Sequence, residues 1–118
     1  MVTGKGKRST IITLKKFGLT HHFGQIETGS AEGPIKEQGI AAILRSWPDL
    51  DKSSIIYVGD APSDITASRK AGINVVAAAW AGTADPEKLL ANHPDKIFYS
   101  VTAFSEWLQS HLSAPPLA

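Results

Sequence analysis

The apolar and polar residues of this chain switch repeatedly between the spacing of a strand and the spacing of a helix. The clearest strand signal is the apolar run 55–58, which is too short for a helix and typical of a buried parallel strand. The other expected strands are 1–3, 25–28, 74–79 and 96–99. The expected helices are 9–17, 36–47, 64–71, 85–91 and a last one capped by Ser100 or Thr102.

This alternation predicts an α/β fold built as a three-layer, Rossmann-like parallel sheet. A chain of 118 residues is long enough to form one domain with a real core. We expect the domain at residues 1–112 and a flexible C-terminal tail at 113–118, where prolines and small residues replace the helical pattern.

The composition is that of an ordinary soluble globular protein, with 42% hydrophobic and 19% charged residues. The net charge of +1 gives no bulk electrostatic reason to expect a nucleic-acid or membrane partner. The chain has no cysteine, which excludes disulfides, thiolate zinc sites and cysteine nucleophiles. No apolar run approaches the roughly 18 residues of a membrane span, so we expect a cytoplasmic protein.

Two carboxylates, Asp60 and Asp64, directly follow the apolar run 55–58. Ligands of open α/β sheets bind at the carboxyl ends of the strands, and carboxylate oxygens suit a hard cation such as Mg²⁺. An ordinary turn in which Asp64 caps the next helix explains the same residues. Both interpretations stay open on this stretch alone.

Basic residues and histidines give weaker signals. Lys36 stands in the first turn of a predicted helix, where its charge opposes the helix dipole unless an anion lies nearby. The stretch 4–7 is expected to be a flexible turn, which could offer N–H groups to a phosphate but is more often an ordinary turn with solvated lysines. His21 and His22 are expected to be loop residues, because adjacent side chains rarely point at one ion.

The block IIYVGDAPSDITASRKAGINVVAAAWAG, residues 55–82, resembles the fourth motif of the haloacid dehalogenase (HAD) superfamily. That motif is an apolar strand and Gly-Asp-x-x-x-Asp, followed by an Ala-rich helix that ends in Lys-Ala-Gly and by another strand. Val2-Thr3-Gly4-Lys5 looks like the second motif, and Lys36 occupies the place of the motif lysine, with its proline before it (Pro34) rather than after it. The stretch 93–108 is similar to the end of phosphoglycolate-phosphatase-like members, so the resemblance covers essentially the whole chain.

The resemblance implies a Mg²⁺-dependent phosphatase for a small phosphorylated metabolite. It implies that Thr3 hydrogen-bonds the transferring phosphoryl oxygen and that Lys36 neutralises negative charge at the catalytic centre. It further implies that Asp60 holds Mg²⁺. Asp64 would either contribute to the metal site, directly or through water, or position Lys36.

One part of the family pattern is absent from these residues. The family's aspartate nucleophile lies in an Asp-x-Asp motif at the end of the central strand, and here only Met1 and Val2 precede the second motif. The triplet Asp49-Leu50-Asp51 has the same spacing, but it follows a helix and a proline in a connector and has no apolar strand before it. We therefore expect an incomplete core without nucleophile strand or cap, inactive alone and belonging to a longer protein.

The absent strand would leave an apolar gap between the strand 55–58 and the strand that ends at Thr3. We expect either that these two strands pair directly or that a second copy of the chain covers the gap, giving a homodimer. Two functions stay open. One is the C-terminal part of a HAD-type phosphatase, and the other is a non-catalytic α/β interaction module with a vestigial metal site.

Overall fold

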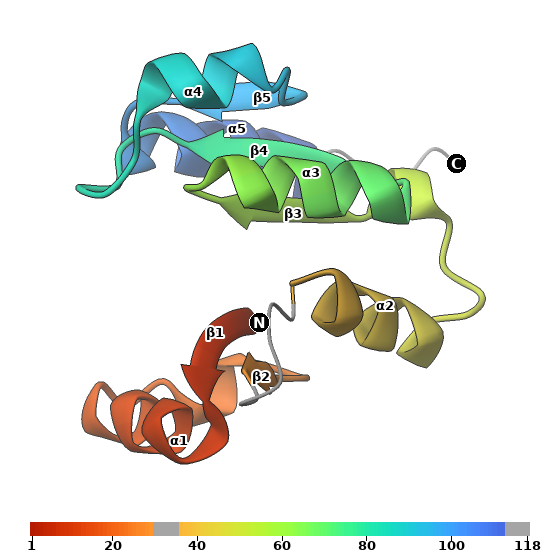
Figure 1. Cartoon of the computed structure of the whole chain (residues 1–118), viewed down its shortest axis with the longest axis vertical. Coiled ribbons are helices and arrows are strands. Elements are labelled where there is room, and N and C mark those ends of the chain that lie inside the picture. Colours follow the sequence, from red (N-terminus) through yellow and green to blue (C-terminus); the bar gives the residue numbers. More distant parts are fainter. Residues whose placement is uncertain (30–35, 113–118) are drawn as a thin grey trace.

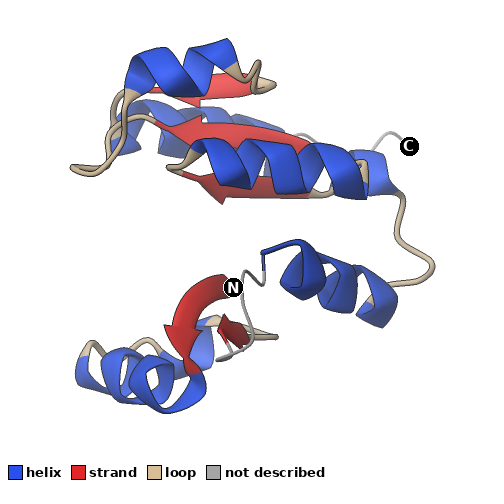
Figure 2. Cartoon of the chain, viewed as in Figure 1, coloured by secondary structure: helices blue, strands red, loops and turns tan. Residues whose placement is uncertain are grey.

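The structure is a computed structural model, and it describes residues 1–29 and 36–112. Strands and helices alternate along the chain, as the sequence pattern predicts (Figure 2). The strands are β1 (Val2–Gly6), β2 (Glu27–Gly29), β3 (Ile56–Gly59), β4 (Asn74–Ala78) and β5 (Lys96–Phe98). The helices are α1 (Lys7–Lys16), α2 (Lys36–Ser46), α3 (Pro62–Ala71), α4 (Pro86–Ala91) and α5 (Val101–Leu112), with short 3-10 turns at Thr20–His22 and Lys52–Ser54.

In the part of the chain that the structure describes, every strand pair is parallel and the strands form two sheets. One sheet contains β1 and β2, and the other has the order β3-β4-β5. In the larger sheet Val58 is in register with Val76, and Ala77 with Ile97. Of the two expected arrangements, direct pairing of β1 with β3 does not occur within the described residues.

Helix α2 lies between the two sheets and joins them (Figure 1). It contacts β1 and β2 on one side and α3 on the other, while α3 packs against β3 and β4. Helix α5 packs against β5. The fold is therefore an α/β core with parallel strands and helices as layers, divided into two parts by the space between β1 and β3.

The buried core has two clusters. The first contains Ile40 of α2, Ile55 before β3, Ala67 of α3 and Ile73 before β4, with Val2 of β1 packed against it. The second surrounds the central strand β4 and consists of Ile65, Val75, Ala77 and Leu89. The first cluster is what holds the smaller sheet to the larger one.

The prediction of a buried strand at 55–58 is wrong for half of its residues. Ile56 is 37% exposed and Val58 is 39% exposed. Strands of parallel sheets are buried when both faces and both edges are covered. Within the described residues β3 pairs only with β4, so one edge and part of one face lie open.

The N-terminal predictions also need correction. Residues 4–6 continue strand β1 instead of forming a flexible turn, and α1 begins at Lys7. Of the apolar residues at helical spacing here, Leu14 is buried, whereas Ile11 is 54% and Phe17 67% exposed. The polar residue Thr10 is also buried.

Helix ends follow the local sequence more closely. Gly18 and Gly72 have φ values of 68° and 76°, the left-handed conformation that ends a helix at a glycine. Ser100 caps α5, because its Oγ accepts the Ala103 N–H at 3.1 Å. The tail expected at 113–118 lies outside the described residues.

Candidate functional site

The carboxylate of Asp64 is the centre of the candidate site. Asp64 lies at the third position of α3, just beyond the carboxyl end of β3, and is only 4% exposed. Its Oδ2 accepts the Ala61 N–H at 3.0 Å, and its Oδ1 accepts the Tyr57 hydroxyl at 3.3 Å. Asp64 is thus not the N-cap that the plain-turn interpretation assigns to it, because Ala61 holds that position.

Gly59 makes this position of the carboxylate possible. A Cβ atom at residue 59 would collide with the Asp64 carboxylate, which lies directly against the Gly59 backbone. The Gly-Asp-x-x-x-Asp spacing therefore has a steric basis in this chain. The glycine ends β3 and leaves room for an acid from the first turn of α3.

Lys36 reaches the same carboxylate from α2. Its Nζ lies 2.9 Å from Asp64 Oδ1 and donates to Ser63 Oγ at 2.8 Å. The Lys36 side chain is 33% exposed, whereas that of Asp64 is 5% exposed. The anion that the sequence pattern requires near this lysine is Asp64, which offsets its unfavourable place in the first helical turn.

Asp60 is half-buried and has a different partner. Its Oδ2 accepts the Thr83 hydroxyl at 2.7 Å. Thr83 lies in the loop after β4, and Trp80 at the start of this loop packs against Phe104 of α5 with ring centroids 5.4 Å apart. The sequence analysis did not identify Thr83, since nothing near residue 83 in the chain signals a contact with Asp60.

These residues do not by themselves fit a Mg²⁺ ion. Both Asp64 oxygens have hydrogen-bond partners, and one of them is paired with Lys36. Among the described residues, no three His, Cys, Asp or Glu side chains are grouped to hold a metal. Mg²⁺ sites use one or two carboxylates completed by water and substrate oxygens, and Asp60 alone offers such a carboxylate here.

Thr3 belongs to the smaller sheet. It lies in β1, is half-buried, and its Oγ1 accepts the Lys5 N–H at 3.2 Å. No hydrogen bond joins it to Lys36, Asp60 or Asp64 within residues 1–29 and 36–112. The structure thus brings Lys36 and Asp64 together, and it leaves Thr3 on the other side of the space between the sheets.

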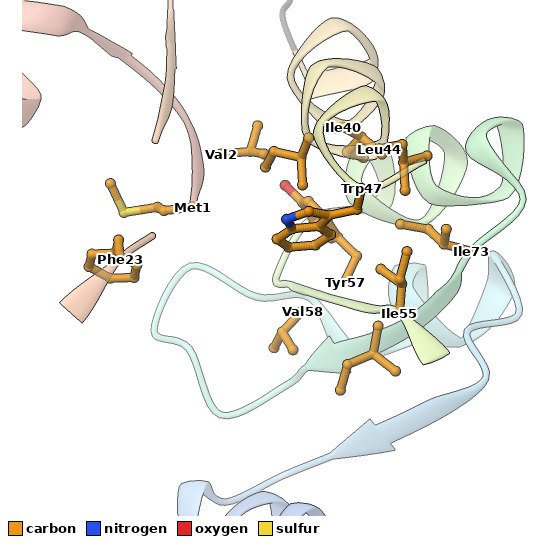
Figure 3. A pocket seen from close by; sticks show the side chains of 12 residues that line it. Met1, Val2, Phe23, Ile40, Leu44, Trp47, Ile55, Tyr57, Val58 and Ile73 are labelled. Carbon is orange, nitrogen blue, oxygen red and sulfur yellow. The ribbon is translucent and has the colours of Figure 1, made fainter. Parts of the chain in front are cut away.

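That space is an apolar groove of about 300 Å³. Side chains from both sheets and from α2 face it (Figure 3). Its lining includes Val2 of β1, Leu44 of α2, Trp47, and Tyr57 and Val58 of β3. Burial in this region, and then the negative charge of Asp64, raise the pKa of Tyr57 well above its usual range. Tyr57 therefore stays a neutral hydrogen-bond donor to Asp64.

A parallel α/β core with a lysine and two aspartates at the carboxyl end of one strand defines the class of HAD-like proteins. The family profile described as haloacid dehalogenase-like hydrolase matches residues 1–78 of this chain. Since the match covers more than half of the chain, the chain belongs to the haloacid dehalogenase-like hydrolase family. A search of curated proteins finds no significant match.

Solved structures support this assignment. A haloacid dehalogenase-like family hydrolase from Streptococcus pneumoniae is 26% identical, with a TM-score of 0.75, and the match covers 86% of this chain and 48% of that one. A protein assigned as a phosphatase from Clostridium difficile is 25% identical, with a TM-score of 0.74, covering 82% of this chain and 46% of that one. A haloacid dehalogenase-like protein from Agrobacterium tumefaciens, 15% identical, shares the fold with a TM-score of 0.76 over 95% of this chain and 54% of that one. The chain spans about half the length of these structures.

Proposed function

We propose that this chain is the C-terminal part of a HAD-type phosphatase that acts on a small phosphomonoester. The main support for the proposal is the ion pair between Lys36 and the buried Asp64 carboxylate at the carboxyl end of β3. A lysine that is held by a nearly inaccessible carboxylate, and whose own side chain is one-third exposed, is suited to bind a phosphate oxygen. The Clostridium difficile protein that is similar to this chain is assigned as a phosphatase.

Each site residue would have a separate role in the reaction. Lys36 would neutralise charge on the phosphoryl group, and Asp64 would hold the lysine in place, a role that its contacts support better than direct metal binding. Thr3 would donate a hydrogen bond to a phosphoryl oxygen. Asp60, fixed by Thr83, would give one carboxylate to Mg²⁺, and the other ligands would come from outside residues 1–118.

The nucleophile would also come from outside these residues. A further strand would fit the apolar groove between β1 and β3. The groove lies between the two sheets, and its lining consists mainly of aliphatic and aromatic side chains. A strand there would carry the aspartate to the same edge as Lys36 and Asp60, because the carboxyl ends of parallel strands lie at one edge of a sheet. The chain alone would then be inactive.

A second function is favoured by the same groove. If no nucleophile strand fills it, the open apolar surface suits a non-catalytic α/β module that binds a partner, for which a second copy of the chain in a homodimer is the simplest case. A vestigial site in such a module would agree with the ligand set for Mg²⁺, which is incomplete among the described residues.

The proposal is tested with the longest protein that the coding sequence specifies and p-nitrophenyl phosphate as substrate. We expect Mg²⁺-dependent hydrolysis, and we expect Lys36→Met or Asp60→Asn to lower kcat/KM by roughly 100-fold or more. Lys70→Met removes an exposed lysine that pairs with Glu37 across the same two helices and serves as the matched control. Absence of phosphatase activity, or equal losses in the control, would favour the non-catalytic module.

A further inference from the structure

The basic residues of this chain are gathered at its N-terminal end. Residues 1–26 contain five of the twelve Lys and Arg side chains and none of the eleven Asp and Glu side chains. The net charge of +1 is therefore the sum of two opposite contributions. The N-terminal part, made of β1, α1 and the 3-10 turn, is positive, and the rest of the chain is negative.

The exposed face of α1 combines this charge with apolar side chains. We call it the α1 face and define it by Arg8, Ile11, Ile12, Lys15 and Lys16, all of which are exposed. Ile12 is 60% exposed and lies opposite the buried residues Thr10 and Leu14. With 3.6 residues per turn, Arg8 and Lys16 lie one turn before and after Ile12, so the apolar centre of this face has positive charges around it.

The positive charges of the α1 face have no acidic partner among the described residues. The ion pairs present there join Lys36 to Asp64, Arg69 to Asp95 and Lys70 to Glu37, far from α1 in the chain. Lys5, which precedes α1, forms a side-chain hydrogen bond to this helix, because its Nζ donates to Thr13 Oγ1 at 3.3 Å. The charge and the apolar surface are both available to a partner.

We propose that the α1 face binds the surface of a bilayer that contains anionic lipids. Helix α1 would lie in the plane of the interface, with Ile11 and Ile12 between the headgroups and the basic side chains beside the lipid phosphates. Across residues 1–29 and 36–112, every helix is too short or too polar to span a membrane. The proposed contact is therefore peripheral, and it replaces the expectation, drawn from the average charge, that no membrane is involved.

The apolar centre is the reason for choosing a lipid surface over a nucleic acid. Nucleic-acid surfaces combine basic residues with aromatic side chains that stack on bases, whereas the centre of the α1 face is formed by two isoleucines. Aliphatic side chains surrounded by Lys and Arg are typical of helices that lie on membranes. The proposal does not depend on phosphatase activity.

The test is flotation of the chain with phosphatidylcholine vesicles, with and without phosphatidylserine, at low and high salt. We expect binding to the anionic vesicles that is at least about tenfold stronger than to the neutral ones and that weakens with salt. The double variants Lys15→Glu/Lys16→Glu and Ile11→Ser/Ile12→Ser should each weaken it about tenfold or more. The control Lys88→Glu/Lys96→Glu makes the same change of net charge at exposed positions outside α1 and should bind like the original chain.

Several results would overturn the proposal. These are equal binding to neutral vesicles, no vesicle binding, equal loss in the Lys88/Lys96 control, or full vesicle binding by the Ile11/Ile12 variant. A dimer that the Ile11/Ile12 variant dissociates would show that a second copy covers the face, and RNA binding without vesicle binding would assign it to nucleic acid. Urea unfolding of each variant verifies folding, and Lys15→Gln/Lys16→Gln replaces the charge reversal if that variant is unfolded.

Discussion

The Lys36 ammonium group and the Asp64 carboxylate lie 2.9 Å apart, with side chains 33% and 5% exposed, and they tie α2 to α3 at the end of β3. The pair is asymmetric, because the acid is buried and the base reaches solvent. Without Lys36, the negative charge of Asp64 would stay buried, with only two neutral hydrogen-bond donors among the described residues, the Tyr57 hydroxyl and the Ala61 N–H. The stability of this corner of the fold therefore depends on Lys36.

The first prediction concerns the cost of removing this lysine. Lys36→Met should lower the free energy of unfolding by roughly 1–2 kcal/mol, less than a fully buried pair would give, because solvent screens the exposed side of Lys36. Urea denaturation measures the change. Lys70→Met removes the exposed pair with Glu37 between the same helices and should cost less than about 0.5 kcal/mol. Equal costs for the two variants would contradict a special role of Asp64.

The second prediction concerns the glycine beneath the carboxylate. Gly59→Ala should lower the stability by about 2 kcal/mol or more, because the added methyl group has to displace Asp64 or bend β3. Gly82→Ala is the matched control, since a Cβ atom there meets nothing within 4 Å, and its effect should stay within about 0.5 kcal/mol. A Gly59→Ala protein as stable as the control would show that Asp64 does not lie against this backbone.

The third prediction follows from the raised pKa of Tyr57. Burial and the Asp64 charge favour the protonated phenol in the folded state, so its contribution to stability is complete below the ordinary tyrosine pKa of about 10 and declines at higher pH. Above this value the chain should lose up to about 1.4 kcal/mol per pH unit more than Tyr57→Phe does. Urea unfolding in alkaline buffers measures the difference. Tyr99→Phe, which changes an exposed tyrosine, should follow the original chain, and an identical pH profile for Tyr57→Phe would refute the assignment.

The fourth prediction compares two valines that are in register on neighbouring strands. Val58 is 39% exposed beside the groove, whereas Val76 is 1% exposed in the centre of the larger sheet. Val58→Thr should change the stability by less than about 0.5 kcal/mol, and Val76→Thr should cost about 1–3 kcal/mol, because it buries a hydroxyl group. Calorimetry of the two variants tests whether the groove is open in solution. Similar large costs would mean that something covers Val58.

The elements with strong local signals could be predicted from the sequence. The strand near 55–58, the helix after Asp64 and the strand containing Val75 follow from short apolar runs and a glycine stop, and the structure contains all three. The Asp60 and Asp64 positions at the end of β3 follow from the same local pattern. These features depend on residues that are neighbours in the chain.

The features that could not be predicted depend on distant parts of the molecule. The exposure of Val58 reflects what lies beside β3, and the outward position of Ile11 reflects which side of α1 packs on β1 and β2. Helical spacing shows that a helix has an apolar face but does not show whether anything covers it. The hydrogen bond between Thr83 and Asp60 joins the segments that follow two neighbouring strands, and no local sequence pattern predicts it.

The central claim is that these residues form part of a phosphatase site that a further strand completes between β1 and β3. The most direct measurement mixes the chain with a synthetic peptide, an apolar strand that ends in Asp-x-Asp-Gly-Thr, and follows Mg²⁺-dependent hydrolysis of p-nitrophenyl phosphate. Fluorescence of Trp47, which lines the groove, reports binding when Trp80 and Trp107 are replaced by Phe.

We predict turnover by the mixture, none by the chain alone, and binding without turnover when the first aspartate of the peptide is replaced by asparagine. Robust Mg²⁺-dependent turnover by the chain alone would contradict the account. So would a peptide that fails to bind the groove, or that binds it without producing any turnover.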